Sequence, residues 1–470
     1  MGLSGGTTTY RQLHERSLRL AHTLREWGLR RGDGIAIVME NRAEYLEIAW
    51  AAQRSGLYYT AVNWHLQPSE IAYIVHDCEA KVLFTSAMMA DTIAALDGEI
   101  PNVTRTISVD GGLPEAMLYT DALAAGSDSP LPEPCEGCEL LYSSGTTGRP
   151  KAVKRPLPPV GEVLVNHQYA AAIYRDRYGV TEDSVYLSPA PLYHSAPITS
   201  VLTIHRLGGT VVVLERFDAE RTLALIQDLG VTHAQFVPTM FVRMLKLDPA
   251  VRLRYDVSSL HCAIHASAPC PIRVKQEMID WWGPILEEYY SGTEGMGATT
   301  INSVEWLAHP GSVGRPAGCI IHIVGDDGEE LPPLATGRVF FESNRKFEYL
   351  HDPEKTASVR DSHGWRTLGD VGHVDDDGYV YLTDRATFMI VSGGVNIYPQ
   401  EIEDLLIAHP AVQDAAVFGV PNEDFGEEVK AVVQITGVVP AGDELAQTLI
   451  DFCRANLAHY KAPRSIDFAD

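Results

Sequence analysis

Helix-like and strand-like segments alternate through the first ninety residues of the chain, and this alternation limits the fold more than any other feature. Leu13, Leu20 and Leu24 share one helical face in the segment LHERSLRLAHTLREWG. The strand-like runs IAIVM, YYTAV and KVLFTS follow, separated by the helix-like AEYLEIAWAAQRSG and PSEIAYIVHDC. Because such βα repetition is typical of parallel sheets, we predict an α/β fold with a mostly parallel first sheet.

The same alternation returns after a connection rich in Pro, Gly and Ser at residues 110–139. The runs SVYLSP, TVVVLE, THAQFVP, LHCAIHAS and ILEEYYSG predict a second parallel sheet. From about residue 311, turns such as GDDGEE and DDDGYV separate β-branched and aromatic runs, which predicts a β-rich subdomain over residues 311–384. We therefore predict a large N-terminal domain over residues 1–384 and a small α+β domain over residues 385–470.

The chain carries 62 acidic against 37 basic residues, so its formal net charge is -25. That charge disfavours nucleic acid or an anionic membrane as a partner, because both surfaces are negative. No apolar run reaches the length of a membrane-spanning helix, and the start MGLSGG lacks the apolar core of a signal peptide. We therefore expect a globular protein of the cytoplasm without a transmembrane segment.

Seven cysteines are scattered over the 470 residues, an odd number without dense spacing. This pattern is typical of reduced thiols rather than of a disulfide framework. Cys135 and Cys138 form a C-x-x-C pair, but no second pair or histidine cluster lies near it in the sequence. We therefore expect neither a metal nor a redox function for this pair.

The segment YSSGTTGRPK, residues 142–151, combines hydroxyl side chains, two glycines and two cations. It departs from the Walker loop G-x-x-x-x-G-K-[ST], since Pro150 precedes Lys151 and Ala152 replaces the Ser or Thr. The flanking runs CELLY and KAVKR predict a strand, a loop and a strand. Such a loop can wrap a polyphosphate, because its hydroxyl and backbone N–H groups donate hydrogen bonds and Lys151 supplies positive charge. A glycine-rich turn without a ligand is the alternative interpretation.

Further polar clusters follow predicted strands at their C-terminal ends, where α/β sheets usually bind ligands. These clusters are PLYHSAP, HASAP and YYSGTEG. Downstream, WRTLGDVG contributes Asp370, and TDRATFMIVSGGVNIYPQEIE contributes Arg385 and a Gly-Gly loop. We expect the three strand-end clusters to face one crevice.

Taken in order, YSSGTTGRPK, PLYHSAP, YYSGTEG, WRTLGDVG, TDRATFMIVSGGVNIYPQEIE and HYKAPR resemble the motifs of the adenylate-forming superfamily. This superfamily contains acyl-CoA synthetases, luciferases and the adenylation domains of peptide synthetases, and the chain looks most like a bacterial acyl-CoA synthetase. The resemblance implies a reaction in which a carboxylate attacks the α-phosphate of ATP and pyrophosphate leaves. A thiol, that of CoA in the synthetases, then takes the acyl group. A carboxylate needs no base at neutral pH, so positioning and charge neutralisation would carry the catalysis.

The resemblance also implies roles for individual residues. Tyr290 would stack on the adenine, Thr293 would donate to the α-phosphate, and Glu294 would bind Mg²⁺. Asp370 would accept hydrogen bonds from the ribose hydroxyls, and Arg385 would help to hold them. The residues implied in catalysis are Thr146, Lys151, His194, Thr293 and Glu294, with Thr146 and Glu294 also at the metal. Nucleotide contacts are implied for Ser143, Ser144, Gly145, Thr147, Gly148, Ser267, Ala268, Pro269, Tyr290, Ser291, Gly292, Asp370 and Arg385.

The small C-terminal domain of the family rotates between the two steps, so the resemblance implies a mobile domain here. The hinge position is Thr387, where family members usually have Asp or Lys. The Gly-Gly loop would then line the tunnel for the pantetheine arm of CoA. Contacts to CoA are implied for Gly393, Gly394, Lys430, Lys461 and Arg464.

Each of these residues also has a plain structural interpretation. Glu294 alone reads as a solvated turn carboxylate, and His194 as a structural histidine. Asp370 and Arg385 read as surface charges, and the three C-terminal cations, Lys430, Lys461 and Arg464, read as solvated side chains.

The chain departs from the family after HYKAPR. Family members continue to a segment P-R-T-x-x-G-K, whose Lys reaches the α-phosphate, whereas this sequence stops at Asp470, six residues after Arg464. The front also looks shorter than in relatives. We therefore expect weak adenylation, with thioester formation from supplied acyl-AMP retained.

The acid is inferred by exclusion. Amino-acid-activating relatives place an Asp for the substrate ammonium in the segment matched by PLYHSAP, and Tyr193 and His194 offer none. A fatty acid or another hydrophobic acid is therefore favoured, with aryl, sterol-derived and long-chain acids all open. Three other functions stay open: an acyl-AMP ligase for a carrier protein, a catalytically impaired adenylate-binding protein, and a P-loop NTPase. The sequence does not fix the oligomeric state, and a homodimer is left open.

Overall fold

A computed structural model describes residues 6–143, 149–385, 388–392, 395–422, 425–437 and 439–469. The chain divides into two compact units. The first unit comprises residues 1–235, 257–262 and 346–356, and the second comprises residues 236–256, 263–345 and 357–470. The domain division at residues 384 and 385 stays a prediction.

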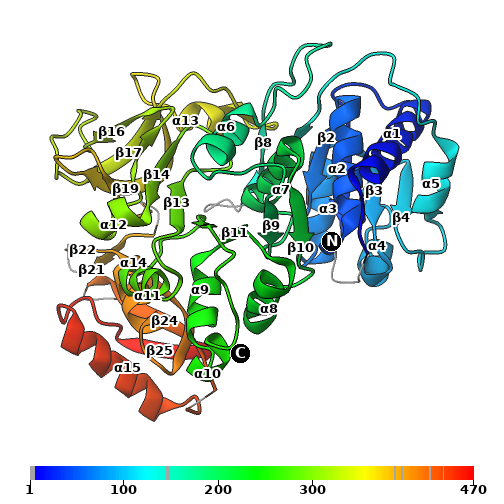
Figure 1. The fold of residues 1–470 in the computed structure, drawn as a ribbon. Coiled ribbons are helices and arrows are strands. Elements are labelled where there is room, and N and C mark those ends of the chain that lie inside the picture. Colours follow the sequence, from blue (N-terminus) through cyan, green and yellow to red (C-terminus); the bar gives the residue numbers. More distant parts are fainter. Residues whose placement is uncertain are drawn as a thin grey trace. The chain divides into compact units, whose positions relative to one another are not determined.

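The first unit begins with the six-stranded sheet that the βα repetition predicts. Its strand order is β5-β4-β3-β1-β2-β6, and every neighbouring pair is parallel. Apolar side chains fill both faces of the central strands, and α1 packs against α2 (Figure 1). The strands are β1 (Gly34–Val38), β2 (Tyr58–Ala61), β3 (Ala80–Thr85), β4 (Arg105–Ser108), β5 (Met117–Leu118) and β6 (Cys138–Glu139). The helices are α1 (Tyr10–Glu26), α2 (Ala43–Ser55), α3 (Pro68–Asp77), α4 (Ala90–Ala94) and α5 (Tyr119–Ala125), with a 3₁₀ turn η1 (Ala87–Met89).

A small antiparallel sheet follows in the same unit, in the order β18-β8-β7. It contains β7 (Leu141–Ser143), β8 (Lys151–Lys154) and the distant β18 (Glu348–Tyr349). The strand β9 (Val185–Ser188) comes next and pairs in parallel with β10 (Thr210–Val213) and β11 (His233–Phe236). The intervening helices are α6 (Gln168–Asp176), α7 (Ser195–Leu207) and α8 (Ala219–Leu229).

The second unit contains the parallel pair β12 (Cys262–His265) and β13 (Leu286–Tyr290). Two antiparallel strands, β14 (Ala298–Asn302) and β15 (Arg315–Ala317), extend this pair, so this part is mixed rather than parallel throughout. The strand β14 can pair antiparallel with β13 because the chain turns back directly after YYSGTEG without a crossover helix. Its helices are α9 (Pro238–Leu245), α10 (Pro249–Arg252), α11 (Ile272–Trp282) and α12 (Ser303–Ala308).

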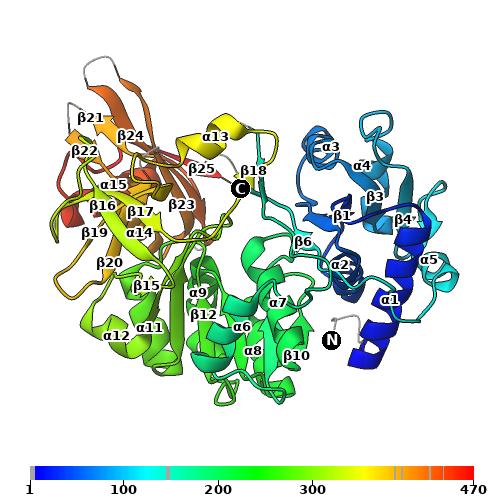
Figure 2. The same ribbon diagram turned by 90° about the horizontal axis from the view of Figure 1, so that it is seen from above.

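An antiparallel sheet in the order β16-β17-β19-β20 forms the β-rich part of the second unit (Figure 2). The predicted turns are present, with Gly328 and Gly378 in the left-handed region at φ values of 85° and 83°. The strands are β16 (Ile320–Val324), β17 (Gly337–Glu342), β19 (Arg366–Val374) and β20 (Val380–Arg385); a short helix, α13 (Pro353–Ser358), precedes β19.

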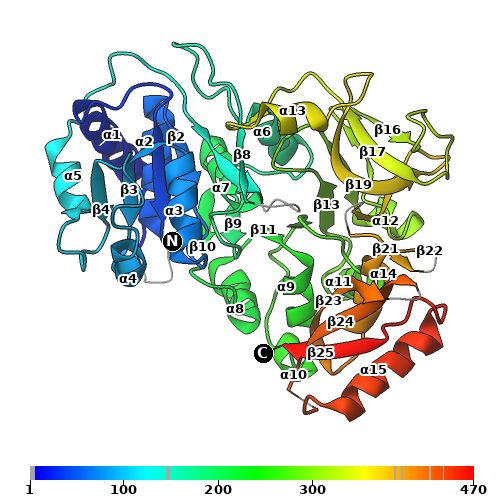
Figure 3. The ribbon, with the colours of Figure 1, turned by 180° about the vertical axis from the view of Figure 1, so that it is seen from behind.

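The C-terminal part of the second unit is a sheet in the order β22-β21-β24-β23, with β25 parallel to β24. Buried side chains of α14, α15 and the sheet form its core, and α15 lies beside β25 (Figure 3). This part, predicted as α+β, contains helix, strand, strand and helix in that order from α14 to α15. The elements are β21 (Ile390–Ser392), β22 (Val395–Ile397), α14 (Pro399–Ile407), β23 (Val412–Asn422), β24 (Gly426–Ile435), α15 (Asp443–Asn456) and β25 (Ser465–Ala469).

The α/β fold class is therefore confirmed. Within the described residues, no helix combines the length and apolar character needed to cross a bilayer. The seven cysteines are free, and both Cys135 and Cys138 are buried.

Candidate functional site

The strand-loop-strand arrangement predicted for YSSGTTGRPK is present at its described ends. β7 and β8 pair antiparallel, with Ser143 opposite Lys151, and the Ser143 hydroxyl donates to the Lys151 carbonyl at 3.4 Å. Residues 144–148 lie outside the described part of the chain. The roles implied for Ser144, Gly145, Thr146, Thr147 and Gly148 therefore stay predictions.

The Lys151 ammonium is paired with the Asp352 carboxylate. Asp352 lies just beyond β18, which pairs with β8, and its other oxygen accepts a hydrogen bond from the Lys355 N–H at 2.8 Å. The Lys151 and Lys355 contacts lower the pKa of Asp352. The Lys151 ammonium is thus paired with a carboxylate, and the phosphate contact implied for it stays a prediction.

Tyr290 and Asp370 meet in the second unit. The Tyr290 hydroxyl, at the end of β13, donates to Asp370 on β19 at 2.5 Å. Asp370 is buried, with 7% of its surface exposed. The structure therefore brings together the two residues to which the motifs assign the adenine and the ribose.

The segment that follows Tyr290 is shaped by close contacts. A Cβ atom at Gly292 would lie 2.4 Å from the Leu368 side chain and 2.7 Å from the Glu294 carboxylate, so a larger residue there would require these two side chains to shift. The Ser291 hydroxyl donates to the Gly297 carbonyl at 2.6 Å. Thr293 and the half-buried Glu294 lie three and four residues after Tyr290 in this segment.

The segment HASAP follows the end of β12. Ser267 has φ of 78°, in the left-handed region that a non-glycine residue seldom occupies. Ser267, Ala268 and Pro269 are exposed, whereas Ala266 is buried. Strained backbone of this kind is frequent at ligand sites, and the nucleotide contacts implied for residues 267–269 stay predictions.

His194 lies at the N-terminal end of α7 within a row of aromatic rings. Its ring centre is 4.5 Å from that of Tyr193, which in turn is 6.5 Å from His65. The rings of His65 and Trp64 are 3.5 Å apart. Tyr193 and His194 belong to the motif PLYHSAP and were named from the sequence, whereas Trp64 and His65 follow β2 outside the motifs that carry the resemblance.

The three predicted C-terminal cations all have partners in the chain itself. Lys430 pairs with Asp467 at 2.7 Å, and Lys461 pairs with Glu401 at 2.5 Å. The guanidinium of Arg464 lies 4.5 Å from the centre of the Phe425 ring. Gly393, Gly394 and Thr387 lie outside the described residues, as does the side chain of Arg385, so their implied roles stay predictions.

A buried charged cluster lies directly behind HASAP and Tyr290, and sequence reasoning missed it. Lys275 on α11 donates to Glu288 on β13 at 2.5 Å and lies 5.0 Å from the centre of the Trp306 ring. His265 is opposite Glu288 in the register of β12 and β13, with its Nε2 3.7 Å from the carboxylate. Burial and the Lys275 charge hold the pKa of His265 well below its usual range, so the imidazole is neutral.

Comparison with known families shows to which family this chain belongs. The sequence profile of the AMP-binding enzyme family matches residues 3–347, and that of the AMP-binding enzyme C-terminal domain matches residues 401–470. The chain belongs to the AMP-binding enzyme family. The resemblance inferred from the motifs is confirmed, and so is the prediction of an AMP-forming ligase.

Curated relatives and solved structures cover nearly the whole of this AMP-binding enzyme. A feruloyl-CoA synthase from Amycolatopsis sp is 34% identical, over 99% of this chain and 91% of the relative. The long-chain-fatty-acid–CoA ligase FadD13 from Mycobacterium tuberculosis is 31% identical, over 98% of this chain and 89% of the relative. The crystal structure of ATP-bound MatB from Rhodopseudomonas palustris matches with a TM-score of 0.82 and 27% identity, over 100% of this chain and 91% of that chain.

Replacing Tyr290 by Phe tests the Tyr290–Asp370 contact of this AMP-binding enzyme. The change removes a donor from a buried carboxylate, which costs roughly 1–3 kcal/mol, so we expect the KM for ATP to rise about tenfold. The measurement is pyrophosphate release against ATP concentration. Tyr289→Phe on the same strand is the control and should change the KM less than about twofold, because strand alternation turns its ring to the other face. An unchanged KM in Tyr290→Phe would separate this pair from nucleotide binding.

Proposed function

We propose that the protein is an ATP-dependent acyl-CoA synthetase that activates a hydrophobic carboxylic acid as acyl-AMP and transfers it to CoA. The observation that carries this proposal is the pair of anchored groups, Lys151 on the β7–β8 hairpin and Tyr290 with Asp370, in a member of the AMP-binding enzyme family. Two relatives of 34% and 31% identity that act as CoA ligases support the choice of acceptor.

In the first step, the substrate carboxylate attacks the α-phosphorus of ATP, and the bond to the pyrophosphate oxygen breaks. Lys151 would leave Asp352 and neutralise charge on the phosphates, while Thr293 would donate to the α-phosphate. Tyr290 would lie against the adenine, with Asp370 at the ribose. The hydrogen bond between these two side chains would fix their spacing, and positioning of this kind is the main source of rate in phosphoryl chemistry.

Glu294 fits a magnesium ion by the chemistry of its donor atoms, because hard carboxylate oxygens suit this metal. The Glu294 side chain is half-buried, four residues after Tyr290. When bound, the ion would supply positive charge to the triphosphate. We propose Glu294 as its protein ligand, with Thr146 as a second one.

In the second step, the CoA thiol attacks the acyl carbonyl, and AMP leaves with the oxygen that came from the carboxylate. Lys430, Lys461 and Arg464 would bind the phosphates of CoA, together with the Gly393–Gly394 loop at the pantetheine arm. Lys430 and Lys461 now pair with partly exposed carboxylates, and such surface pairs contribute only about 0–1 kcal/mol. Exchange of these partners for phosphate therefore costs little. Residues 385–470 would move as a small domain between the steps, with Thr387 at the hinge.

The acid is proposed to be hydrophobic, in the fatty or aryl class. Tyr193 and His194 offer no carboxylate for an amino group, and the adjoining Trp64 and His65 rings present apolar surface. The relatives named above act on feruloyl and long-chain fatty acyl groups, which supports both classes.

A panel of fatty, aryl and sterol-derived acids tests the proposal. Pyrophosphate release is measured with and without each acid, and the acyl-CoA product is detected by chromatography. We expect acid-dependent release for one class and a thioester only when CoA is present. The same assay on a chain carrying an added P-R-T-x-x-G-K segment tests the expectation of weak adenylation. ATP binding without pyrophosphate release for any acid, in either chain, would contradict the proposal.

A further inference from the structure

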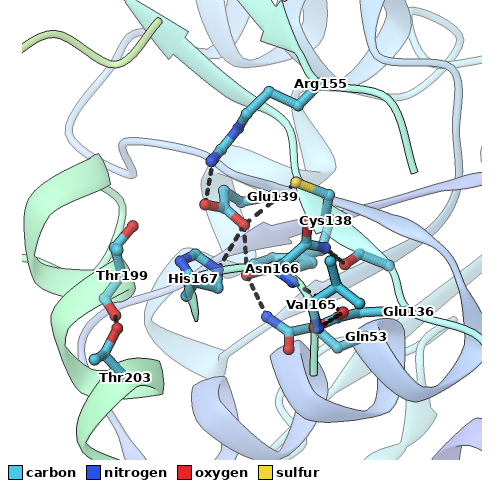
Figure 4. A network of polar contacts seen from close by, with 12 residues as sticks. Gln53, Glu136, Cys138, Glu139, Arg155, Val165, Asn166, His167, Thr199 and Thr203 are labelled. Carbon is cyan, nitrogen blue, oxygen red and sulfur yellow. Dashed lines mark hydrogen bonds and ion pairs between the residues drawn. The ribbon is translucent and has the colours of Figure 1, made fainter. Parts of the chain in front are cut away.

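Two buried glutamates, Glu136 and Glu139, lie just before the β7–β8 hairpin and are not accounted for by the reaction. Their exposed fractions are 3% and 1%. Glu136 binds the Arg206 guanidinium at 2.7 Å and accepts hydrogen bonds from the backbone N–H groups of Val165 and Asn166. Glu139 is the last residue of β6, and its carboxylate instead pairs with Arg155, directly after β8 (Figure 4).

Glu139 and Arg155 close the base of the hairpin. The Arg155 guanidinium contacts the Glu139 carboxylate. In the register of β7 and β8, Leu141 lies opposite Val153, so Glu139 and Arg155 continue the same row two residues further on. The Tyr58 hydroxyl also donates to the Arg155 carbonyl at 2.7 Å. The chain is therefore tied at one point where it enters and leaves the hairpin.

Further groups converge on the same carboxylate. The Nε2 atom of His167 lies 3.3 Å from Glu139, and both side chains are almost fully buried. The Tyr59 hydroxyl donates to the carboxylate at 3.4 Å. His167 precedes α6 with φ of 63°, a strained backbone for a residue with a side chain. Figure 4 shows Arg155 and His167 reaching Glu139 from different directions.

The carboxylate is held in its charged form. Burial would raise the pKa of Glu139, but Arg155 and then His167 outweigh it and keep the pKa well below its usual range. The Glu139 side chain is 1% exposed and the Arg155 side chain 32%, and an ion pair with a buried carboxylate is often no more stabilising than a well-packed apolar pair. Fold stability is therefore a poor reason for a charged pair at this point, and a requirement for defined geometry is the better one.

Lys151 is the group whose position this geometry sets. It is the first residue of β8, and Arg155 directly follows the last residue of that strand, four positions after Lys151, so continued alternation of side chains would put both on one face of the hairpin. Asp352 holds the ammonium end of Lys151, and Glu139 holds the other end of its strand through Arg155. We propose that Glu139 and Arg155, supported by His167, are positioning residues that align Lys151 with ATP in the adenylation step. This inference rests on the proposed function.

An apolar replacement of the whole pair separates positioning from stability. The double variant Glu139→Leu/Arg155→Met removes both charges from the full chain and leaves no buried charge alone. We expect its thermal midpoint to stay within a few degrees of the unaltered chain. We expect kcat/KM for ATP in acid-dependent pyrophosphate release to fall about 10²-fold, because a misplacement of about 1 Å has that effect. Thioester formation from supplied acyl-AMP and CoA should change less than about threefold, since it needs no phosphate contact from Lys151.

The matched control is a second pair of a partly exposed arginine with a buried glutamate in the same unit, Arg16 on α1 and Glu47 on α2, whose side chains are 38% and 3% exposed. Glu47 likewise accepts from a tyrosine, Tyr119, at 2.8 Å. The double variant Arg16→Met/Glu47→Leu should leave kcat/KM for ATP unchanged within about twofold, because this pair does not border the hairpin. An equal fall in both double variants would overturn the proposal.

Other outcomes are also decisive. A stable Glu139→Leu/Arg155→Met variant with unaltered kcat/KM for ATP would show that the pair serves the fold alone. If this variant does not fold, Arg155→Lys tests the positioning role instead, because it keeps the positive charge and removes the planar guanidinium. We expect about a tenfold fall in kcat/KM for Arg155→Lys, and an unchanged value would overturn the proposed positioning role.

If the unaltered chain releases no pyrophosphate with any acid, the proposed function fails. Calorimetric binding of ATP to the same variants then tests the alignment of Lys151, with about tenfold weaker binding expected and unaltered binding contradicting it.

Discussion

Replacing Lys151 by Met is expected to lower kcat/KM for ATP in acid-dependent pyrophosphate release about 10²- to 10³-fold. A fixed donor aimed at developing negative charge is worth that much in related chemistry. The structure explains why this cation and not another carries the effect: it stands opposite Ser143 at the end of the hairpin, with its ammonium oriented by Asp352. The measurement is steady-state pyrophosphate release at varied ATP and saturating acid.

Lys154 on the same strand is the matched control for this experiment. It pairs with Glu348 at 3.6 Å and lies 5.7 Å from the centre of the Tyr58 ring, on the face of β8 opposite to Lys151. Lys154→Met should therefore keep kcat/KM within about threefold. Equal losses in the two variants, or retained activity in Lys151→Met, would contradict the role given to Lys151.

Replacing Lys275 by Met is expected to lower the free energy of unfolding by about 3–5 kcal/mol, because the change leaves the Glu288 carboxylate buried without its cation. Removing Lys275 also removes one of the two causes that lower the pKa of His265, but burial, the larger cause, remains. The measurement is the urea midpoint followed by near-ultraviolet circular dichroism. The second variant, Lys275→Met/Glu288→Leu, should recover most of the loss, because it removes both charges together.

Arg273 serves as the control on the same helix. It forms an exposed pair with Glu277 at 3.4 Å, so Arg273→Met should cost less than about 1 kcal/mol. A Lys275→Met variant as stable as Arg273→Met would show that the Lys275–Glu288 pair does not hold β12, β13 and α11 together. A double variant as unstable as the single one would show that the loss comes from packing and not from charge.

The sequence predicted those parts of the fold and site that belong to a motif or to a periodic pattern of apolar residues. The alternation of residues 13–85 gives the first sheet because apolar runs and amphipathic segments have different periods. Tyr290 and Asp370 lie 80 residues apart, yet both were named because each belongs to a motif.

The missed parts depend on contacts that leave no local signal. Asp352 reaches Lys151 across 201 residues of sequence through a two-residue strand, which is too short to show a period. Lys275 reads as a surface cation, because lysine is seldom fully buried, and only the packing of α11 on β13 shows otherwise. Glu139 lies in the run CELLY, which predicts a strand without indicating its partner, so its burial beside Arg155 follows from the pairing of β6 with β2. The roles implied for the loop at residues 144–148 stay predictions.

The central claim is that a carboxylate oxygen of the acid becomes bonded to the α-phosphorus of ATP. An acid labelled with ¹⁸O in both carboxylate oxygens, chosen from the panel, tests it directly when the enzyme turns over with ATP and CoA. Attack at the α-phosphorus followed by thiol transfer predicts AMP that carries one ¹⁸O atom, acyl-CoA that keeps the other ¹⁸O atom in its thioester carbonyl, and unlabelled pyrophosphate. Unlabelled AMP, or label in inorganic phosphate beside ADP, would contradict the account.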